Sequence, residues 1–190
     1  GASSCMVSPL GVLAVGSQYT SAFQGNDGRV MIWDGLPTTN GEACDVVVGK
    51  SLATTEESAC TPSLTRAIDG VAFSADGTKL LVSDAGNNRI LIWNSIPTTT
   101  GQAANVVIGQ TDFVTSTSGC SATKMLSPKS LVVTPDGRLF VADMGNNRVL
   151  VYNTIPTTNG AAADVVIGQD DFNTNTSGNA AHKMNGPWDI

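Results

Sequence analysis

Residues 145–160 read GNNRVLVYNTIPTTNG, and residues 86–101 repeat this stretch closely as GNNRILIWNSIPTTTG. A weaker version, NDGRVMIWDGLPTTNG, occupies residues 26–41. The arginines that anchor the three versions recur about every 60 residues, and a fixed period is typical of solenoids, propellers and other repeat arrays. They are Arg29, Arg89 and Arg148. The chain is therefore built from repeated units, and the rest of the sequence is interpreted against this repeat.

Each unit contains four short runs of strand-forming residues that are separated by turns. In the third unit, Pro135-Asp136-Gly137 is a tight-turn tripeptide, and the Gly and Asn of residues 145–147 tolerate the positive φ of the next turn. The expected strands span residues 11–15, 19–23, 29–33 and 45–49 in the first unit, 70–74, 79–84, 89–94 and 105–109 in the second, and 130–134, 138–143, 148–153 and 163–168 in the third.

The third strand of every unit is apolar at successive positions, as in Ile90-Leu91-Ile92-Trp93. Strict alternation would indicate one wet face, whereas continuous apolarity indicates a strand that is covered on both faces. Four-stranded antiparallel units of this kind, repeated along the chain, predict an all-β fold, namely a β-propeller made of blades. We expect a partial propeller that forms part of a six-bladed ring, with blades at about residues 7–50, 66–110 and 127–169 and the start of a fourth at about residues 186–190.

The composition favours some partners and excludes others. Of the 190 residues, 41% are hydrophobic and only 14% are charged, whereas soluble domains carry roughly 25% charged residues, so a secreted or extracytoplasmic location in the periplasm or at the cell surface is favoured. The net charge is −6 and the basic residues are scattered, which argues against nucleic acid as a partner because polyanion binding needs clustered Lys and Arg. No apolar run approaches the ~20 residues of a transmembrane helix, so membrane insertion is not expected.

The four cysteines include no C-x-x-C pair, which argues against a zinc ribbon or a redox motif. An even number of cysteines in an extracytoplasmic chain favours disulfides. A bridge between Cys44 and Cys60 would close a short loop at one edge of a unit and is the preferred pairing, which leaves Cys5 with Cys120. Four unpaired, partly buried thiols are the alternative, and Cys60 and Cys120 hold matching positions in successive repeats.

The repeat resembles the NHL-repeat family of β-propellers, in particular a bacterial extracytoplasmic type with repeats of about 60 residues. The resemblance rests on a tight turn, a strand that ends in Asp, and then Asn-Asn-Arg before an apolar strand. These elements are Pro135-Asp136-Gly137, Asp143 and Asn146-Asn147-Arg148 in the third unit, and Ala75-Asp76-Gly77, Asp84 and Asn87-Asn88-Arg89 in the second. The first unit departs from the pattern, because it lacks Pro-Asp-Gly and has Gln24 where the strand-ending Asp should stand. The resemblance implies a propeller, usually of six blades, but no activity, since members bind proteins, RNA or small molecules and a few are enzymes.

The most prominent polar residues are the aspartates that precede Asn-Asn-Arg. They could form a cation or ligand site at the turns, or they could accept turn N–H groups and pair with the arginine. Their return in consecutive units favours the second interpretation, because every blade needs its turn whereas a site is needed only once. We therefore expect structural repeat turns made of Asp84, Asn87, Asn88, Arg89, Asp143, Asn146, Asn147 and Arg148.

No catalytic set is evident in the sequence. His182 is the only histidine, and a Ser-His-Asp triad or a His-rich metal centre would depend on it alone. We therefore predict no catalytic residue, no metal site and no cofactor. Asp112 and Asp170-Asp171 could bind a hard cation such as Ca²⁺, but no Asp-x-Asp-x-Asp-Gly loop surrounds them, and we expect solvated loop acids.

A ligand or partner surface is expected where innermost strands begin, since a propeller presents the mouth of its channel there. The residues at these positions are Asp69, Lys129, Trp188 and Asp189. The leading hypothesis is a non-enzymatic, secreted or surface-exposed propeller that serves as a protein-interaction or structural scaffold module, with protein partners or self-association through incomplete flanks. Two alternatives stay open: a metal-dependent, lactonase-like hydrolase whose site lies in the channel, and a subunit of a filament or large extracellular assembly.

Overall fold

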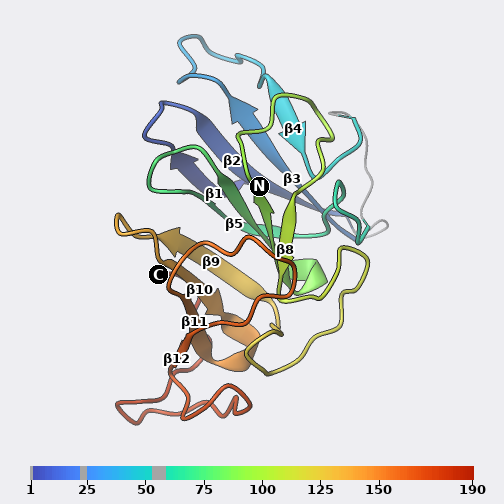
Figure 1. Ribbon diagram of the computed structural model, residues 1–190. Helices are drawn as coiled ribbons and strands as arrows, with labels where there is room; N and C mark the ends of the chain where they lie inside the picture. The colour runs from blue at the N-terminus through green and yellow to red at the C-terminus, as the bar shows by residue number, and fades with distance from the viewer. Residues whose placement is uncertain (1, 22–24, 53–58) are drawn as a thin grey trace.

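The computed structural model describes residues 2–21, 25–52 and 59–190, and its strands form three four-stranded antiparallel sheets (Figure 1). The first sheet contains β1 (Ala2–Val7), β2 (Leu13–Ser21), β3 (Gly25–Trp33) and β4 (Val46–Val48). The second contains β5 (Ile68–Phe73), β6 (Leu80–Asp84), β7 (Arg89–Trp93) and β8 (Val106–Ile108), and the third contains β9 (Pro128–Val133), β10 (Leu139–Asp143), β11 (Arg148–Tyr152) and β12 (Val165–Ile167). Over the described ranges, neither of the two short helices has the length and apolarity that crossing a membrane would require.

Each sheet is an up-and-down meander whose turns use the residues that recur in the sequence. Gly77, at φ 75°, closes the turn after β5 by donating its N–H to the carbonyl three residues earlier at 2.8 Å. A 3-10 turn, η1 (Ala85–Asn87), joins β6 to β7, and Asn88 follows it in the left-handed region at φ 55°. The third sheet repeats both devices with Gly137 and η2 (Met144–Asn146). Repeated turn residues therefore produce repeated hairpins.

The three sheets stack face to face, with β1, β5 and β9 side by side as the innermost strands (Figure 1). One hydrophobic core, around Ile32, Val82 and Trp93, lies between the first and second sheets. A second core, around Ile92 and Leu150, lies between the second and third sheets. Strands β6, β7 and β8 are buried at every position, because alternate residues face different neighbouring sheets. The fold is an all-β, partial β-propeller with three four-stranded blades.

The third sheet is covered on only one of its faces. Val165 and Ile167 of β12 are 47% and 42% exposed, whereas Val106 and Ile108 at the same positions of β8 are 3% and 0% exposed. A fourth blade would cover these side chains as the third blade covers those of β8. The six-bladed ring itself stays a prediction.

The first two strands of the first unit differ from the prediction. They lie at Ala2–Val7 and Leu13–Ser21 rather than at residues 11–15 and 19–23, so the first sheet begins ahead of the expected blade start at about residue 7. The reason is the turn at residues 8–11, where Gly11 donates its N–H to Ser8 O at 2.9 Å, so the apolar run that follows begins the second strand. Residues 22–23 of the expected second strand and Gln24 lie outside the described residues.

The C-terminal segment also differs from the prediction. Residues 186–190 were expected to begin an innermost strand, and they carry no strand. The segment ends beside β9 (Figure 1), and the Trp188 ring covers the Lys129 ammonium group. The segment therefore occupies the inner edge of the stack without pairing into a sheet.

The expected disulfides are absent, which corrects that prediction: free thiols are found at Cys5, Cys44, Cys60 and Cys120. Cys60 Sγ donates to Thr115 O at 3.0 Å, and Cys120 Sγ donates to Thr174 O at 3.2 Å. Burial raises the pKa of both thiols. Their matching positions in the repeat therefore reflect matching hydrogen bonds to the next link, one blade apart.

Candidate functional site

The Asp-Asn-Asn-Arg turn of the second blade forms a buried network that holds the neighbouring links. Arg89 Nε donates to Asp84 Oδ2 at 2.7 Å, and both side chains are fully buried. Asp84 also accepts the N–H of Arg66 at 2.9 Å and an N–H of Asn87 at 2.8 Å. The rest of the guanidinium donates to three link carbonyls, those of Phe113, Thr61 and Leu64, at 2.7, 2.9 and 3.0 Å. Burial raises the pKa of the Asp84 carboxyl, and Arg89 with the N–H donors opposes this rise.

The third blade repeats the network atom for atom. Arg148 Nε donates to Asp143 Oδ2 at 2.7 Å, Asn146 Nδ2 donates to the same oxygen at 2.8 Å, and the other oxygen accepts the N–H of Leu126 at 2.7 Å. The guanidinium again donates to three link carbonyls, those of Phe172, Ser121 and Lys124. Every carboxylate oxygen in these turns already has a protein donor. These contacts fix the turns against the links, and the expectation that the turns are structural rather than a cation site stays a prediction.

Asn88 and Asn147 connect each blade to the segment that opens the next repeat. Both lie in the left-handed region, at φ 55° and 54°, which Asn tolerates better than most residues. Asn88 Oδ1 accepts the N–H of Ser127 at 2.9 Å, directly before β9, and Asn147 Oδ1 accepts the N–H of Gly186 at 2.8 Å. Asn147 therefore holds the C-terminal segment where the start of a further innermost strand would lie.

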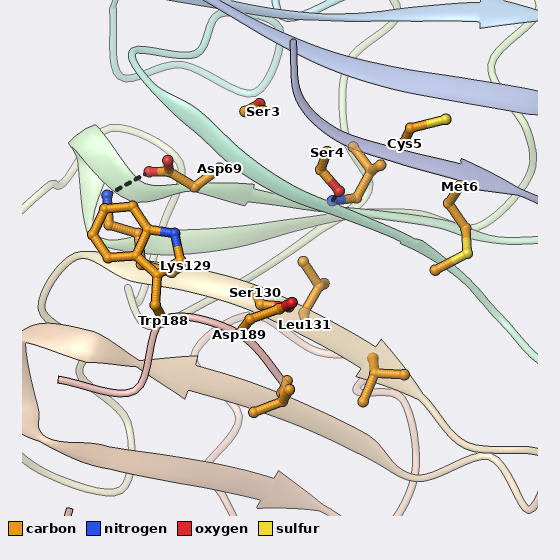
Figure 2. Close-up of a pocket in the computed structure, with 13 residues that line it drawn as sticks. Ser3, Ser4, Cys5, Met6, Asp69, Lys129, Ser130, Leu131, Trp188 and Asp189 are labelled. Atoms are coloured by element: carbon orange, nitrogen blue, oxygen red, sulfur yellow. Dashed lines mark hydrogen bonds and ion pairs between the residues drawn. The ribbon is translucent and has the colours of Figure 1, made fainter. Parts of the chain in front are cut away.

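A pocket of about 340 Å³ opens between the innermost strands β1, β5 and β9 and the C-terminal segment (Figure 2). We call it the axial pocket. It is lined by all four residues of the expected channel-mouth surface, Asp69, Lys129, Trp188 and Asp189. Residues 3–6 of β1 also line it, and sequence reasoning missed them because β1 was not recognised as a strand. The use of this surface by a ligand or partner stays a prediction.

Lys129 is the centre of charge in the axial pocket. Its Nζ lies 2.8 Å from Asp69 Oδ2 and 4.6 Å from the centre of the Trp188 ring (Figure 2). The Lys129 and Asp69 side chains are only 15% and 13% exposed, so solvent screens this pair less than a surface pair. Trp188 is 64% exposed despite its cation–π contact. The pocket therefore offers an aromatic platform next to a neutralised ion pair and the carboxylate of Asp189.

A second arrangement, which sequence reasoning missed, is a loop that covers the outer edge of the preceding blade. Gly101 donates its N–H to Val47 O of β4 at 2.9 Å, and Val47 donates its N–H to a threonine hydroxyl of the same loop at 3.2 Å. One blade further on, Gly160 donates to Val107 O of β8 at 2.9 Å, and Val107 donates to Asn159 Oδ1 at 3.0 Å. An edge strand has unpaired backbone groups, and these loops satisfy them. We call this arrangement the loop-on-edge contact.

Within the described ranges, one loop and one edge strand lack the loop-on-edge contact. The loop at residues 37–41 of the first blade covers no edge strand, and no loop covers Val166, which matches Val107. The repeated Pro-Thr-Thr-x-Gly sequence was a visible signal for the loop. Its target was not visible, because the stacking of the blades decides which edge the loop reaches.

The remaining acidic candidates and the histidine lie outside the axial pocket. His182 Nε2 is 3.5 Å from Asp170 Oδ1, and both side chains are exposed. Asp112 accepts two backbone N–H groups of its own link, which lowers the pKa of its carboxyl, and Asp171 accepts the matching pair in the next link. The part of the chain that the structure describes holds no group of three or more His, Cys, Asp or Glu side chains able to bind a metal ion. That these link acids are solvated loop residues rather than a Ca²⁺ site stays a prediction.

Comparisons with known proteins agree with the fold. A family model for the NHL repeat matches residues 125–152. Hydrazine synthase from Kuenenia stuttgartiensis is similar with a TM-score of 0.52 and 15% identity, over 91% of this chain and 37% of that chain. Regucalcin, a calcium-binding protein from Agrobacterium tumefaciens, has a TM-score of 0.46 and 18% identity over 83% of this chain and 45% of its own. A luciferin-regenerating enzyme has a TM-score of 0.47 and 15% identity, over 86% of this chain and 44% of its own.

These similarities are limited in length and in identity. The chain spans less than half the length of each of these solved chains. No curated protein matches the sequence. Of these structures only the hydrazine synthase chain has a TM-score above 0.5, and at 15% identity it supports the fold alone. What the names of the other two proteins say of calcium or of an enzyme applies to those proteins.

Proposed function

We propose that this chain, which contains an NHL repeat at residues 125–152, is a non-enzymatic propeller module that binds proteins through its open flanks, and that its first partner is a second copy of itself. The supporting observation is the loop-on-edge contact, which is made twice within the chain and is unmatched at both ends of the stack. The loop at residues 37–41 of one copy would cover Val166 of the other. Asn40 and Gly41 would then take the roles that the third blade's loop has over β8.

Neighbouring blades within the chain pack through two different apolar faces, one from each blade. The uncovered face of the third sheet resembles one of these faces, and the uncovered face of the first sheet resembles the other. On the third sheet, Val165 and Ile167 match β8 residues that are buried against the following blade. On the first sheet, three half-buried residues match second-sheet positions that are buried against the preceding blade: Leu13, Val15 and Met31. A contact between two different surfaces closes into a ring or continues as a filament, depending on the rotation per blade. The scaffold and filament hypotheses thus use the same interface.

Size-exclusion chromatography with light scattering tests this proposal. The wild-type chain should form oligomers, and a double variant with Val165→Lys and Ile167→Lys should have the mass of a monomer, because the interface would bury two unpaired charges. Val114→Lys is the matched control, since Val114 is an exposed apolar residue in the link after β8. A wild-type chain that stays monomeric at high concentration, or a double variant that still assembles, would refute the proposal.

The axial pocket favours a second candidate, the metal-dependent hydrolase. Asp189 and Asp69 place two carboxylates in one pocket, and carboxylate oxygens suit a hard cation such as Ca²⁺, which would compete with Lys129 for Asp69. Calorimetric titration with calcium chloride distinguishes the candidates. A saturable heat that is lost in Asp189→Asn would favour the hydrolase, whereas the absence of saturable heat would favour the scaffold module.

We also propose a secreted or extracytoplasmic location. The support is compositional, because only 14% of the residues are charged, whereas soluble domains carry roughly 25%. Fractionation of the source cells, followed by detection with an antibody against the purified chain, tests this location. Recovery from the cytoplasmic fraction alone would contradict it.

A further inference from the structure

The loop after the third strand of the first blade holds a carboxylate. Glu42 Oε2 accepts the N–H of Thr38 at 2.9 Å and the N–H of Thr39 at 3.3 Å. The hydroxyls of the same two threonines lie 3.4 and 3.3 Å from this oxygen. Two backbone N–H groups and two hydroxyls therefore converge on one acceptor, and clustered N–H groups of this kind form anion-binding concavities.

The third blade lacks this acceptor. In the second blade Gln102 Oε1 still accepts the N–H of the first loop threonine at 3.0 Å. The third blade has Ala161 instead, and no acceptor for the N–H groups of Thr157 and Thr158 is found within the described ranges. A pocket of about 290 Å³ lies there, lined by residues that include Tyr152, Thr157, Thr158 and Ala161. We call it the loop pocket.

Tyr152 contributes a buried donor without a partner. Its side chain is 2% exposed, and its hydroxyl has no hydrogen-bond partner among the residues that the structure describes. The other blades have Trp33 and Trp93 at this position, and their Nε1 groups donate to the carbonyls of Glu42 and Gln102 at 3.2 and 3.0 Å. The side chain at this position is thus directed to the same loop in each blade, and a buried hydroxyl without a partner is uncommon.

We propose that the loop pocket binds the carboxylate group of a ligand, with the N–H groups and hydroxyls of Thr157 and Thr158 as donors and with Tyr152 as part of the pocket wall. The carboxylate takes the place that the Glu42 carboxylate has in the first blade. The loop is held in position before the ligand binds, because Gly160 donates to the β8 edge at 2.9 Å. Less ordering is therefore required on binding.

The aspartate that also lines the loop pocket does not exclude a second carboxylate. Asp164 Oδ2 accepts the N–H of Asn153 at 2.8 Å, and Asp45 makes the matching contact in the first blade at 2.9 Å. The first blade thus holds the Glu42 carboxylate in its loop although Asp45, the counterpart of Asp164, is also present. The pKa of Glu42 is nevertheless lowered, and the hydrogen bond from the Thr38 N–H is the largest cause. The donors of this loop therefore favour the charged form of a carboxylate.

Amide NMR of the full chain, titrated with sodium acetate, tests the proposal. Acetate should cause saturable shifts at the amides of Thr157 and Thr158. Ala161→Glu supplies an internal carboxylate and should abolish these shifts. Glu42→Ala opens the matching loop of the first blade and should create a saturable response there.

Two controls separate carboxylate recognition from general effects. Sodium chloride at the same ionic strength should cause no saturable shift, and acetamide, a neutral molecule of similar shape, should bind more weakly than acetate. The dispersion of the remaining amide resonances shows whether each variant is folded. The proposal is overturned if acetate causes no saturable shift at Thr157 and Thr158, or if Ala161→Glu responds as the wild type does.

Discussion

Arg89→Met removes the centre of the buried network in the second blade, and it should lower the free energy of unfolding by roughly 3–5 kcal/mol. Arg89 is fully buried at 2.7 Å from Asp84, so the variant leaves a buried carboxylate without its countercharge. It also removes the donor of three link carbonyls, and each such hydrogen bond contributes about 1 kcal/mol. Methionine is chosen because it fills the space with a flexible apolar chain.

Arg138→Met is the matched control. Arg138 also pairs with an aspartate, at 3.1 Å from Asp136, but the two side chains are 53% and 58% exposed. An exposed pair contributes about 0–1 kcal/mol, so this variant should be close to the wild type in stability. The two variants differ chiefly in the burial of the pair that they break.

Urea unfolding, followed by tryptophan fluorescence and circular dichroism, measures both variants. A lower midpoint at an unchanged slope reports a change in stability alone. A double-mutant cycle with Asp84→Asn separates the stranded charge from the lost link contacts, because Arg89→Met should cost less when the carboxylate is already neutral. A loss below about 1 kcal/mol for Arg89→Met, or equal losses for both arginines, would refute the reasoning that this network secures the links.

Three further predictions concern a turn carboxylate, a left-handed residue and two thiols. The hydrogen bond from Ser74 holds the pKa of Asp76 at about 2, below its ordinary 3.8, so its stabilising effect is present above pH 3.8 and is lost as pH falls through about 2. An acid-unfolding curve that Asp76→Asn leaves unchanged would contradict this. Asn88→Ala should destabilise the chain by roughly 1 kcal/mol more than Asn88→Gly, because glycine adopts φ 55° without the strain that alanine suffers there. Urea unfolding measures both variants, and equal losses of stability would contradict this prediction. Cys5 is exposed and should react with a thiol-specific reagent before Cys60, whose pKa is raised by burial. Equal reaction rates of the two thiols would contradict the partly buried placement of Cys60.

The blades were predictable because their turns are specified locally. Asn88 and Asn147 supply left-handed residues, and Gly77 and Gly137 supply positive φ, so each hairpin follows from a few neighbouring residues. The first blade was harder to predict because its turn, Ser8-Pro9-Leu10-Gly11, has Leu10 where the other units have Asp. The turn chemistry is the same, since Gly11 still has a φ of 86°, but the recognisable tripeptide is missing.

The axial residues could be predicted to converge, whereas the outer contacts could not. Asp69 and Lys129 occupy the same position in successive innermost strands, and such strands lie side by side in a propeller, so sequence register alone brings these side chains together. The loop pocket depends on a comparison that only coordinates permit, because Ala161 is an unremarkable residue until Glu42 is seen to hold the same loop in another blade.

The repeat, the strand content and the all-β class could be predicted from hydrophobic pattern and turn chemistry, because both act over a few neighbouring residues. Three features became visible only once the blades were stacked: Cys60 and Cys120 bond link carbonyls, the Pro-Thr-Thr-x-Gly loops of the second and third blades cover the preceding blade, and Tyr152 has a buried hydroxyl without a partner among the described residues. These contacts join residues that lie far apart in the chain or in different blades. They depend on how twisted sheets stack, and the local pattern of the sequence does not specify that geometry.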